Sequence, residues 1–520
     1  MNGAEKLLET LVASGVEVCF ANPGTSEMQL VSAIGSNSGM RAVLCLFEGV
    51  VSGAADGYAR MRDKPALTLL HVGSGFSNSM ANQHNAKRAH SPIVNVVGDH
   101  ATYHLQYDAP LTSDIPGHAK LVSDWVKVSL SADDLAASGA EAVAAAMQSP
   151  GKIATLVAPA NHAWEEAAEE TLAAEAPPVT AVEDKQVIAA ARALASGKPS
   201  ALLLGGKALR EESLAVAGRI SKATGARVLC ETFAARLQRG AGRFPVERLQ
   251  YFSEQVSGQL EGLQQIILVG AAAPVSFFAY PGKKSWLAPE GCEVIEFATA
   301  GHDLQRSLEA LARQLSADEA AEVAAIAPPF PAPAGALTPV AIGQCLTLLM
   351  PEHAIVSDEA ATCGLGLFPV TENAPPHDWL MLTGGAIGQG LPVSLGAAIA
   401  CPDRKVIALQ ADGSAMYTVQ ALWTMARENT DVTVVIMNNR SYAILNIELA
   451  RVGAGEANAK TLSMLDLSRP DLDWVALAES MGVPASRAHT AEEFHRQFAN
   501  AMEGIGPCLI EAMVDQSFQM

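Results

Sequence analysis

Basic residues are scarce in this chain of 520 residues. Lysine and arginine number 35 against 55 aspartates and glutamates, which gives a net charge of −20. A protein that neutralises the phosphates of nucleic acid or of an acidic membrane needs a basic face, so we expect neither partner. Aromatic residues make up only 5% and charged residues 17%, whereas hydrophobic residues reach 49%. That balance excludes a disordered chain and favours a well-buried one.

Long hydrophobic runs and paired cysteines are also missing. No apolar run approaches the roughly 20 residues that span a bilayer. The N-terminus carries acidic residues where a secretory signal would be basic. The eight cysteines are scattered without a C-x-x-C pair, which is typical of reduced thiols in a core. We therefore expect a cytoplasmic protein.

The length and the alternation of apolar runs with helical stretches predict an α/β protein of three domains. A domain usually takes about 100 to 200 residues. Pro177-Pro178 and the Ala-Pro-rich residues 316–339 indicate linkers. The predicted domains are 1–168, 186–315 and 340–520. Strands are expected at Val16–Ala21, Ala42–Phe47, Ala66–His71, Ile93–Gly98, Ile153–Val157, Ala201–Leu204, Arg227–Cys230, Gln265–Val269, Glu293–Phe297, Lys405–Gln410, Val432–Met437 and Cys508–Val514.

Two polar clusters in the last domain follow neighbouring predicted strands. Asp412 comes after the strand Lys405–Gln410, and Asn439 comes after Val432–Met437, with a helix expected at Ala415–Glu428 between them. Open α/β sheets bind ligands at the carboxyl ends of their strands, and a helix start offers N–H groups to phosphate. Carboxylate and amide oxygens beside a diphosphate suit Mg²⁺. Either cluster alone is also compatible with a simple turn, but the pair at one edge favours a site.

Two further features are the glycines that follow strands of the middle domain and Glu48 in the first domain. Gly205-Gly206 and Gly270 follow strands of the middle domain, but a G-x-G-x-x-G motif is absent, which favours a scaffold over a dinucleotide site. Glu48 stands where an apolar strand ends and a small-residue helix begins. A partly desolvated carboxyl there can share a proton with a ligand nitrogen, although a glutamate that only begins a helix is the alternative.

Five ordered motifs together resemble one known family. The group contains acetolactate synthase, pyruvate decarboxylase and benzoylformate decarboxylase, all dependent on thiamine diphosphate, and the segments HVGSGFSN and ADGSAMYTVQALWTMAREN are most like benzoylformate decarboxylase. The resemblance covers essentially the whole chain and implies three doubly wound parallel-sheet domains. The motifs are ANPGTSE at Ala21–Glu27, Glu48 with the GAADGYAR that ends at Arg60, LLHVGSGFSN at Leu69–Asn78, GGAIGQGLP at Gly384–Pro392, and the Asp412–Asn439 stretch.

The resemblance implies the residues that hold the cofactor. Glu48 matches the glutamate that hydrogen-bonds the aminopyrimidine and so promotes the C2 ylid, while Asn78 aligns with a polar residue near the thiazolium. The Mg²⁺ ligands would be Asp412, Asn439 and the main-chain oxygen of Ser441. The remaining matches are Gly413 and Ser414 at the diphosphate, the Gly385 carbonyl at the 4′-amino group, Ile387 as the apolar wedge under the bent cofactor, and Thr362 as a diphosphate hydroxyl.

For the substrate, the resemblance points to His71 and Thr25, which match a histidine and a hydroxyl of the benzoylformate decarboxylase pocket. A strand-end position makes His71 less like an ordinary core histidine. The other histidines weighed, His84, His104 and His118, are expected to be structural or solvated. Because Glu48 and the metal residues lie in different domains, the family pattern also implies a homodimer or homotetramer with its active site across a subunit interface.

The chain departs from the family pattern at two places. Ala411 replaces the first glycine of the usual Gly-Asp-Gly, which is tolerable if its φ is negative. The second histidine of the decarboxylase pattern has no equivalent between Pro274 and Gly282, where Phe277, Phe278 and Ala279 stand instead. Nothing specifies a flavin, so FAD is not expected. The missing histidine favours carboligation or an unusual substrate.

The sequence thus predicts decarboxylation, carboligation or both of a 2-oxo acid, dependent on thiamine diphosphate and Mg²⁺ and passing through a C2 ylid and an enamine. Two alternatives stay open. One is acetolactate synthase proper, which converts pyruvate to acetolactate. The other is a homologue that binds the cofactor without catalysis; retention of Glu48, His71 and the metal residues argues against it, and Ala411 keeps it open.

Overall fold

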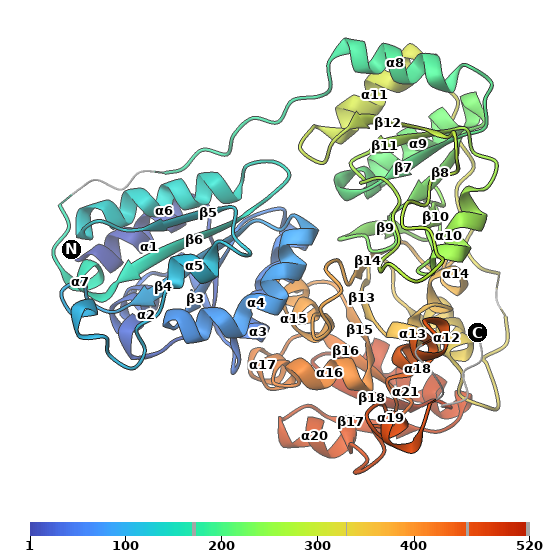
Figure 1. Ribbon diagram of the computed structural model, residues 1–520. Coiled ribbons are helices and arrows are strands. Elements are labelled where there is room, and N and C mark those ends of the chain that lie inside the picture. The colour runs from blue at the N-terminus through green and yellow to red at the C-terminus, as the bar shows by residue number, and fades with distance from the viewer. Residues whose placement is uncertain (169–172, 329, 454–456, 516–520) are drawn as a thin grey trace.

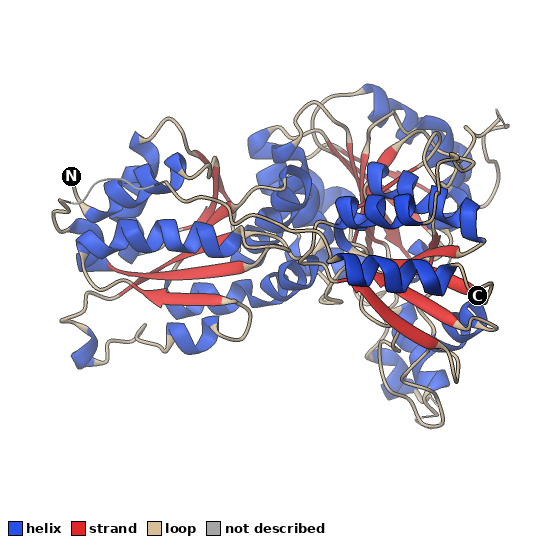
Figure 2. Ribbon diagram, turned by 90° about the horizontal axis from the view of Figure 1, so that it is seen from above, coloured by secondary structure: helices blue, strands red, loops and turns tan. Residues whose placement is uncertain are grey.

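The computed structural model of the protein describes residues 1–168, 173–328, 330–453 and 457–515. Three sheets, each covered by helices, make up its architecture (Figure 1). Helices lie on both faces of the sheets when the molecule is seen from above (Figure 2). The predicted α/β class with three doubly wound, largely parallel sheets is confirmed.

The first sheet has six parallel strands in the order β2-β1-β3-β4-β6-β5. Asn2 begins the first helix through a reciprocal capping box with Glu5, at 2.9 Å in both directions. The strands are β1 Val18–Asn22, β2 Arg41–Leu44, β3 Ala66–Leu70, β4 Ile93–Asp99, β5 Trp125–Val128 and β6 Ile153–Pro159. The helices are α1 Gly3–Ala13, α2 Met28–Ser36, α3 Glu48–Arg62, α4 Val72–Ala89, α5 Ile115–Ala119, α6 Ala132–Ala146 and α7 Ala160–Trp164, with 3-10 turns at Thr25–Glu27 and Leu105–Tyr107.

The second sheet has five parallel strands in the order β10-β8-β7-β11-β12. Its central strands β7 and β11 are buried along their whole length and are mostly apolar, as expected for a parallel sheet covered on both faces. The strands are β7 Ser200–Leu204, β8 Arg227–Cys230, β10 Glu247–Arg248, β11 Gln265–Val269 and β12 Glu293–Ala298. The helices are α8 Asp184–Leu194, α9 Glu211–Thr224, α10 Ser253–Leu260 and α11 Leu304–Gln314, with a 3-10 turn at Gly206–Leu209.

The third sheet has seven strands in the order β17-β18-β16-β15-β13-β14-β9, and only β9 runs antiparallel. The strands are β9 Leu237–Arg239, β13 Ile355–Glu359, β14 His377–Met381, β15 Val406–Ala411, β16 Val432–Asn438, β17 Ala485–Ala488 and β18 Cys508–Met513. The helices are α12 Pro339–Leu349, α13 Ala361–Gly364, α14 Leu367–Val370, α15 Gly390–Ala400, α16 Asp412–Ala415, α17 Ala421–Glu428, α18 Ala443–Arg451, α19 Ala459–Ser463, α20 Trp474–Ser480 and α21 Ala491–Glu503, with a 3-10 turn at Met416–Thr418.

The structure corrects several predicted elements. The sequence analysis did not predict β10, β13, β14 or β17. It also missed β5, a partly exposed edge strand that carries Lys127, and β9, which pairs with β14 of the third sheet. The helix predicted at Ala415–Glu428 is instead a single turn from Asp412, a 3-10 turn and then α17. Strand β2 ends at Leu44, because Phe47 is already the extended residue before α3. The predicted domain limits stay predictions.

Helices α3 and α15 join the first and third sheets through a very close contact. A Cβ on Gly57 would lie 2.1 Å from the carbonyl oxygen of Val393, and a Cβ on Gly396 would lie 1.9 Å from that of Ala54. Only glycine permits backbones to approach so closely. One hydrophobic core accordingly contains residues of both sheets. The contact fixes where the residues at the starts of these helices lie.

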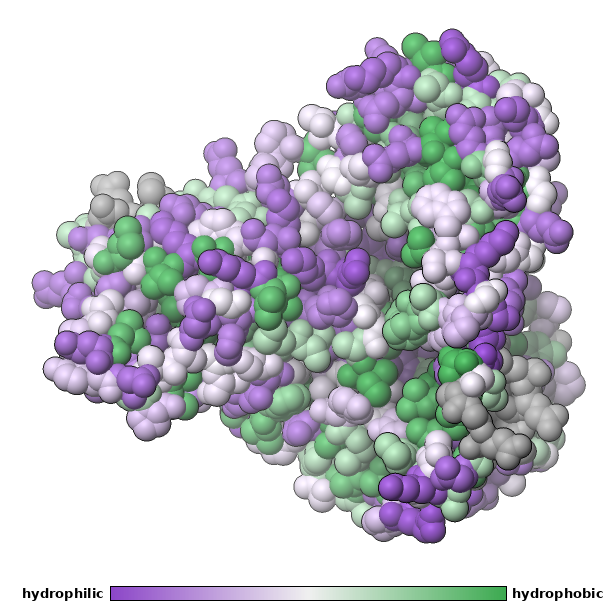
Figure 3. Space-filling model, viewed as in Figure 1, coloured by the Kyte–Doolittle hydropathy of each residue, from purple (hydrophilic) through white to green (hydrophobic). Residues whose placement is uncertain are grey.

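The sequence predicts no membrane-spanning helix and reduced cysteines. Within the described ranges, no helix is long and apolar enough to cross a membrane. All eight cysteines are free thiols, and five of them are buried, as expected for small core residues. Figure 3 shows hydrophobic side chains gathered at the lower right, over the C-terminal part of the chain.

Candidate active site

Glu48 is the first residue of α3 and is 7% exposed. The Asn78 amide on α4 donates a hydrogen bond of 3.0 Å to its Oε2. A Cβ on Gly75 would come within 3.2 Å of the other oxygen, Oε1. The structure therefore brings together Glu48 and Asn78, which the resemblance assigns to the two different rings of the cofactor. The other oxygen of Glu48, Oε1, has no hydrogen-bond partner among the described residues.

His71 directly follows β3, and the carboxylate of Glu27 orients its ring. Glu27 belongs to the ANPGTSE motif, but the sequence indicated no role for it. His71 Nδ1 lies 2.9 Å from Glu27 Oε2 and 3.2 Å from the Ser26 hydroxyl. Glu27 is fully buried and also accepts a hydrogen bond of 2.7 Å from the Gly24 amide. A buried carboxylate at Nδ1 fixes the ring and directs Nε2 elsewhere. Thr25 and His71 line one cavity of about 300 Å³.

A larger cavity of about 460 Å³ lies between the second and third sheets. Thr362, Gly385, Ile387 and Ser414, four of the residues predicted to contact the cofactor, line it together. Gly385 has a φ of 75°, and the Phe277 ring lies so close that a Cβ there would meet it at 2.6 Å. The cavity is mostly apolar with a few converging polar groups, which is typical of cofactor sites.

Glu359, which the sequence analysis missed, holds the loop that carries Gly385 and Ile387. The carboxylate accepts hydrogen bonds from the amides of Gly388, Gln389 and Gly390, at 2.7, 3.2 and 2.7 Å. It is 4% exposed, and burial raises its pKa to about 7 although those amides act in the opposite direction. The signal that could have found it is the short apolar run Ala354–Val356 just before it, where no strand was predicted.

The two polar clusters of the third sheet meet, as the sequence predicted. Asp412 Oδ1 accepts from the Gly413 amide at 2.9 Å, and Oδ2 accepts from the Arg440 amide at 2.8 Å, across the turn after β16. Asn439 Oδ1 accepts from the Ser441 amide at 3.0 Å. The φ of Ala411 is −82°, so the methyl group in place of the usual glycine is tolerated.

The chemistry of this edge fits a hard cation. Asp412 is 2% exposed, and burial raises its pKa to about 6 although backbone amides act in the opposite direction. The described residues hold no cluster of three histidine, cysteine or acidic side chains. A metal here would therefore take oxygen ligands from one carboxylate, an amide, the main chain and a diphosphate, which is a set that Mg²⁺ accepts.

Three turns of the candidate site contain left-handed residues that are not glycine. Val72, Ala361 and Arg440 have φ values of 42°, 49° and 56°. They follow β3, β13 and β16, and so lie beside His71, Thr362 and Asn439. Such backbone conformations cost about 1–3 kcal/mol each and persist where the surroundings impose them, often at functional sites.

The chain does not bring all predicted site residues into one cavity. The residues that line the larger cavity all come from the second and third sheets, whereas Thr25 and His71 line the smaller one within residues 25–164. The remaining histidines have local contacts: His84 Nε2 lies 3.1 Å from the Gly384 carbonyl and His118 Nδ1 lies 3.0 Å from the Ser77 hydroxyl. The His104 ring lies tilted beside His100, with ring centres 5.5 Å apart, in the wall of the smaller cavity.

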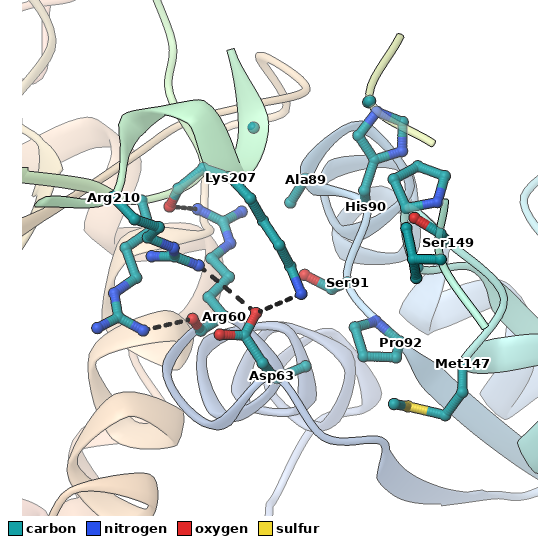
Figure 4. Close-up of a pocket in the computed structure, with 18 of the residues that line it drawn as sticks. Arg60, Asp63, Ala89, His90, Ser91, Pro92, Met147, Ser149, Lys207 and Arg210 are labelled. Atoms are coloured by element: carbon teal, nitrogen blue, oxygen red, sulfur yellow. Dashed lines mark hydrogen bonds and ion pairs between the residues drawn. The ribbon is translucent and has the colours of Figure 1, made fainter. Parts of the chain in front are cut away.

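A third cavity, of about 180 Å³, lies between the first and second sheets (Figure 4). Arg60, Lys207 and Arg210 converge on it, and Asp63 lies 3.3 Å from Lys207 and 3.6 Å from Arg210. Arg60 is held by Asp56 at 2.6 Å. Asp56 and Asp63 thus balance much of the positive charge that lines this cavity. None of the predicted site residues lines it.

Comparison with known proteins places both ends of the chain in one family. Residues 1–119 match "Thiamine pyrophosphate enzyme, N-terminal TPP binding domain" and residues 363–512 match "Thiamine pyrophosphate enzyme, C-terminal TPP binding domain". The chain is 52% identical, over 515 residues and 99% of both chains, to "Putative acetolactate synthase large subunit IlvX" of Mycobacterium tuberculosis. It is 27% identical, over 97% of both chains, to benzoylformate decarboxylase of Pseudomonas aeruginosa.

A solved structure supports the same placement. The thiamine diphosphate-dependent 4-hydroxybenzoylformate decarboxylase of Rhodococcus jostii RHA1 superposes with a TM-score of 0.88 at 26% identity, over 99% of this chain and 100% of that one. The likeness therefore extends over all three sheets.

Proposed function

Because the chain belongs to the thiamine pyrophosphate enzyme family, we propose that it catalyses the thiamine-diphosphate- and Mg²⁺-dependent decarboxylation, carboligation or both of a 2-oxo acid. The observation that carries the proposal is the cavity lined by Thr362, Gly385, Ile387 and Ser414. Ser414 lies in the same short helix, α16, as the buried Asp412 carboxylate. Apolar walls and a cation-binding edge are together what a thiazolium joined to a diphosphate requires.

In this proposal the third sheet binds the diphosphate end. Asp412, Asn439 and the Ser441 carbonyl would hold Mg²⁺, and the cation would neutralise the carboxylate that burial now disfavours. The amides of Gly413 and Ser414, in the first turn after β15, would donate to phosphate oxygens. Thr362 would add a hydroxyl from the opposite wall of the cavity.

Glu48 acts at the pyrimidine end. Asn78 occupies its Oε2, which directs Oε1 toward a ring nitrogen and holds the shared proton there. Ile387 fills the bend between the two rings, and Glu359 keeps its loop in place through three amides. Thiamine diphosphate, when bound, supplies the carbon nucleophile and the electron sink for loss of CO₂. The protein supplies geometry, a proton acceptor and exclusion of water.

His71 and Thr25 would contact the substrate. The Glu27 carboxylate holds Nδ1 of His71, so its Nε2 is the atom available to give or take a proton. The Thr25 hydroxyl lines the same cavity and can orient a substrate oxygen. Loss of the family's second histidine makes His71 the principal candidate for proton transfer in this half of the site.

The proposal includes a homodimer or homotetramer. Glu48 does not line the cavity that holds Ser414, and the cavities of His71 and Ser414 are separate in one chain. A second copy would supply the missing half to each site, as closed two-fold symmetry allows. Sedimentation of the purified protein tests the assembly. The cytoplasmic location expected from the sequence belongs to the same proposal, and cell fractionation tests it.

Acetolactate synthesis from pyruvate is the second candidate, because the relative that shares 52% identity bears that name. Conversion of pyruvate to acetolactate by the purified protein would favour it. Release of CO₂ from larger 2-oxo acids, with no acetolactate from pyruvate, would favour the decarboxylase side of the family.

The decisive experiment supplies purified protein with thiamine diphosphate and Mg²⁺ and offers a panel of aliphatic and aryl 2-oxo acids. We expect CO₂ or a new C–C bond from at least one of them. Glu48→Gln should abolish turnover and C2 hydrogen exchange while cofactor binding remains measurable. Glu141→Gln, which changes an exposed carboxylate in the same part of the chain, is the matched control. A wild type without any product, or a Glu48→Gln variant with full activity, contradicts the proposal.

A further inference from the structure

Arg239 and Arg248 line a cavity of about 310 Å³, the arginine pocket, to which neither the motifs nor the comparisons give a role. Arg239 is the last residue of β9, and Arg248 is the last residue of β10. The pocket adjoins the proposed active-site cavity, because Arg248 and Leu365 line both of them. Arg239 does not line the active-site cavity. The pocket is therefore a neighbour of that cavity and not a part of it.

Both guanidiniums carry a charge that no carboxylate neutralises by direct contact. Arg239 is 6% exposed and donates to two neutral oxygens, the Thr371 hydroxyl at 2.8 Å and the Phe368 carbonyl at 2.6 Å. Arg248 donates to the Met381 sulfur at 3.8 Å, and a thioether is a weak acceptor. In the part of the chain that the structure describes, neither arginine forms an ion pair. A buried charge without an opposite charge is costly, so a bound anion would stabilise the pocket.

The two positive charges also lie close to each other. The Arg239 Cζ atom lies 3.7 Å from the centre of the Phe368 ring, and the Arg248 Cζ atom lies 4.4 Å from the same centre. The pKa of Arg239 is lowered to about 9, mainly by burial and also by the charge of Arg248. Burial lowers the pKa of Arg248 as well. A dianion would relieve both the burial of these charges and their mutual repulsion.

The acidic residues around the pocket do not supply that negative charge. Glu247 and Glu372 line it, but Glu247 is paired with Arg227 at 2.7 Å, and the Glu372 side chain is exposed. Asp358 acts on Arg248 only from beyond ion-pair distance, and its oxygens accept from a backbone amide and from the Trp379 indole, both at 3.2 Å. The Glu372 charge would repel a bound anion, so its removal should strengthen binding.

Apolar side chains form most of the remaining wall of the arginine pocket. They are Phe244, Pro245, Val246, Leu365, Phe368 and Pro369. One water occupies about 30 Å³ in the liquid, so the pocket has room for a phosphate group and a small apolar body. Guanidinium groups bind phosphate oxygens in pairs, and a phosphate monoester carries close to two negative charges at neutral pH.

We propose that the arginine pocket binds a phosphate dianion through Arg239 and Arg248, at a site separate from the one that holds the cofactor. The apolar wall favours a small phosphate monoester over free phosphate, because the ester brings a body that the wall can contact. The inference concerns binding and does not depend on the proposed reaction.

Isothermal titration calorimetry of the holoenzyme, saturated with thiamine diphosphate and Mg²⁺, tests the inference. The cofactor then fills its own diphosphate site, so that site does not compete for the added ligand. The probes are phenyl phosphate, inorganic phosphate and phenol. We expect phenyl phosphate to bind, inorganic phosphate to bind more weakly and phenol not to bind. Equal affinity for the two phosphates would identify free phosphate as the ligand of the same site, whereas phenol that binds as tightly as phenyl phosphate overturns the inference.

Three substitutions assign the binding to the pocket. Arg248→Met should weaken phenyl phosphate binding by roughly tenfold to a hundredfold, as for the loss of hydrogen bonds to a charged group. Arg239→Lys keeps a positive charge beside Thr371 and Phe368 but loses the planar fork, so it should weaken binding less while the protein stays folded. Glu372→Gln should strengthen binding by about twofold to fivefold, as expected for an exposed charge. The last two residues do not line the active-site cavity, so their effects cannot arise there.

Arg306→Met is the matched control, because the Arg306 side chain is 75% exposed and does not line the pocket. Its affinity for phenyl phosphate should equal that of the wild type. A wild type that binds neither phosphate overturns the inference, and so does wild-type affinity in both Arg248→Met and Arg239→Lys. Equal weakening in Arg306→Met would show that only the overall charge matters and would also overturn it. A protein that binds phosphate in this way but converts no 2-oxo acid contradicts the proposed function alone.

Discussion

Replacement of Gly57 by alanine tests how closely the fold couples the two halves of the site. Gly57 lies in α3, where an added Cβ would be 2.1 Å from the Val393 carbonyl oxygen and 2.8 Å from the Val393 Cα and carbonyl carbon. Those atoms belong to the backbone of α15 and cannot turn aside as a flexible side chain would. The two helices must separate by about 1 Å before the contact becomes an ordinary one.

The expected magnitude follows from two opposing effects. Alanine in a helix interior is favoured over glycine by about 0.5–1 kcal/mol. Overpacking typically costs about 1–3 kcal/mol, and a contact between rigid backbones lies at the upper end of that range. We therefore expect a net loss of about 2 kcal/mol in the free energy of unfolding. For a unit of 150–250 residues this lowers Tm by about 4–8 °C.

Differential scanning calorimetry gives the stability, and titration with thiamine diphosphate and Mg²⁺ gives the affinity. Affinity should also fall, because α3 begins at Glu48 and the loop before α15 carries Ile387. The matched control is Gly258→Ala in α10, where no atom lies within 4 Å of the new Cβ. That variant should be neutral or slightly stabilised. Equal Tm values for the two variants would refute the packing argument.

Three further substitutions test other parts of the structure. Asp56→Asn removes the negative charge that balances the buried Arg60 guanidinium at 2.6 Å, so the free energy of unfolding should fall by about 3–5 kcal/mol in urea titrations, and a change below 1 kcal/mol would contradict the buried pair. Asp412→Asn should weaken Mn²⁺ binding at least tenfold by electron paramagnetic resonance, whereas Asp471→Asn, an exposed control, should not. Because burial raises the pKa of Glu359 from 4.5 to about 7, the folded state holds its proton more tightly, and wild-type stability should decline from pH 4.5 to 7 by about 3 kcal/mol relative to Glu359→Gln. A difference between these two proteins that is the same at pH 5 and pH 8 would exclude that ionisation.

The sheets and the metal edge were predictable because their signals are local. Most buried parallel strands are short apolar runs, and the limits of those predicted lie within two or three residues of the observed ones, whereas the buried strands β13 and β14 were not predicted. Asp412 and Asn439 follow two such runs that are adjacent in the chain, and sequential strands of a βαβ unit commonly end at the same sheet edge. The structure connects them through the Arg440 amide, which accords with that reasoning.

Other features depend on contacts that no local pattern reveals. Strand β9 is only three residues long and gains its partner, β14, from a segment more than a hundred residues away. Glu27 and Glu359 are ordinary carboxylates in the sequence, and only the fold shows that one holds His71 and the other holds a loop of three amides. The left-handed conformation of Val72 runs against the preference of a β-branched residue, so tertiary contacts must impose it.

The contact between α3 and α15 also bears on how the two sites of the proposed dimer relate to each other. Within one chain this helix pair sets the distance between Glu48 and Ile387, but in the dimer those two residues serve different sites. In the proposed dimer each site would take its Glu48 from one subunit and its Ile387 from the other. A shift of the helix pair in a single subunit therefore displaces one half of both sites, and the glycines that allow the close approach act on both sites at once.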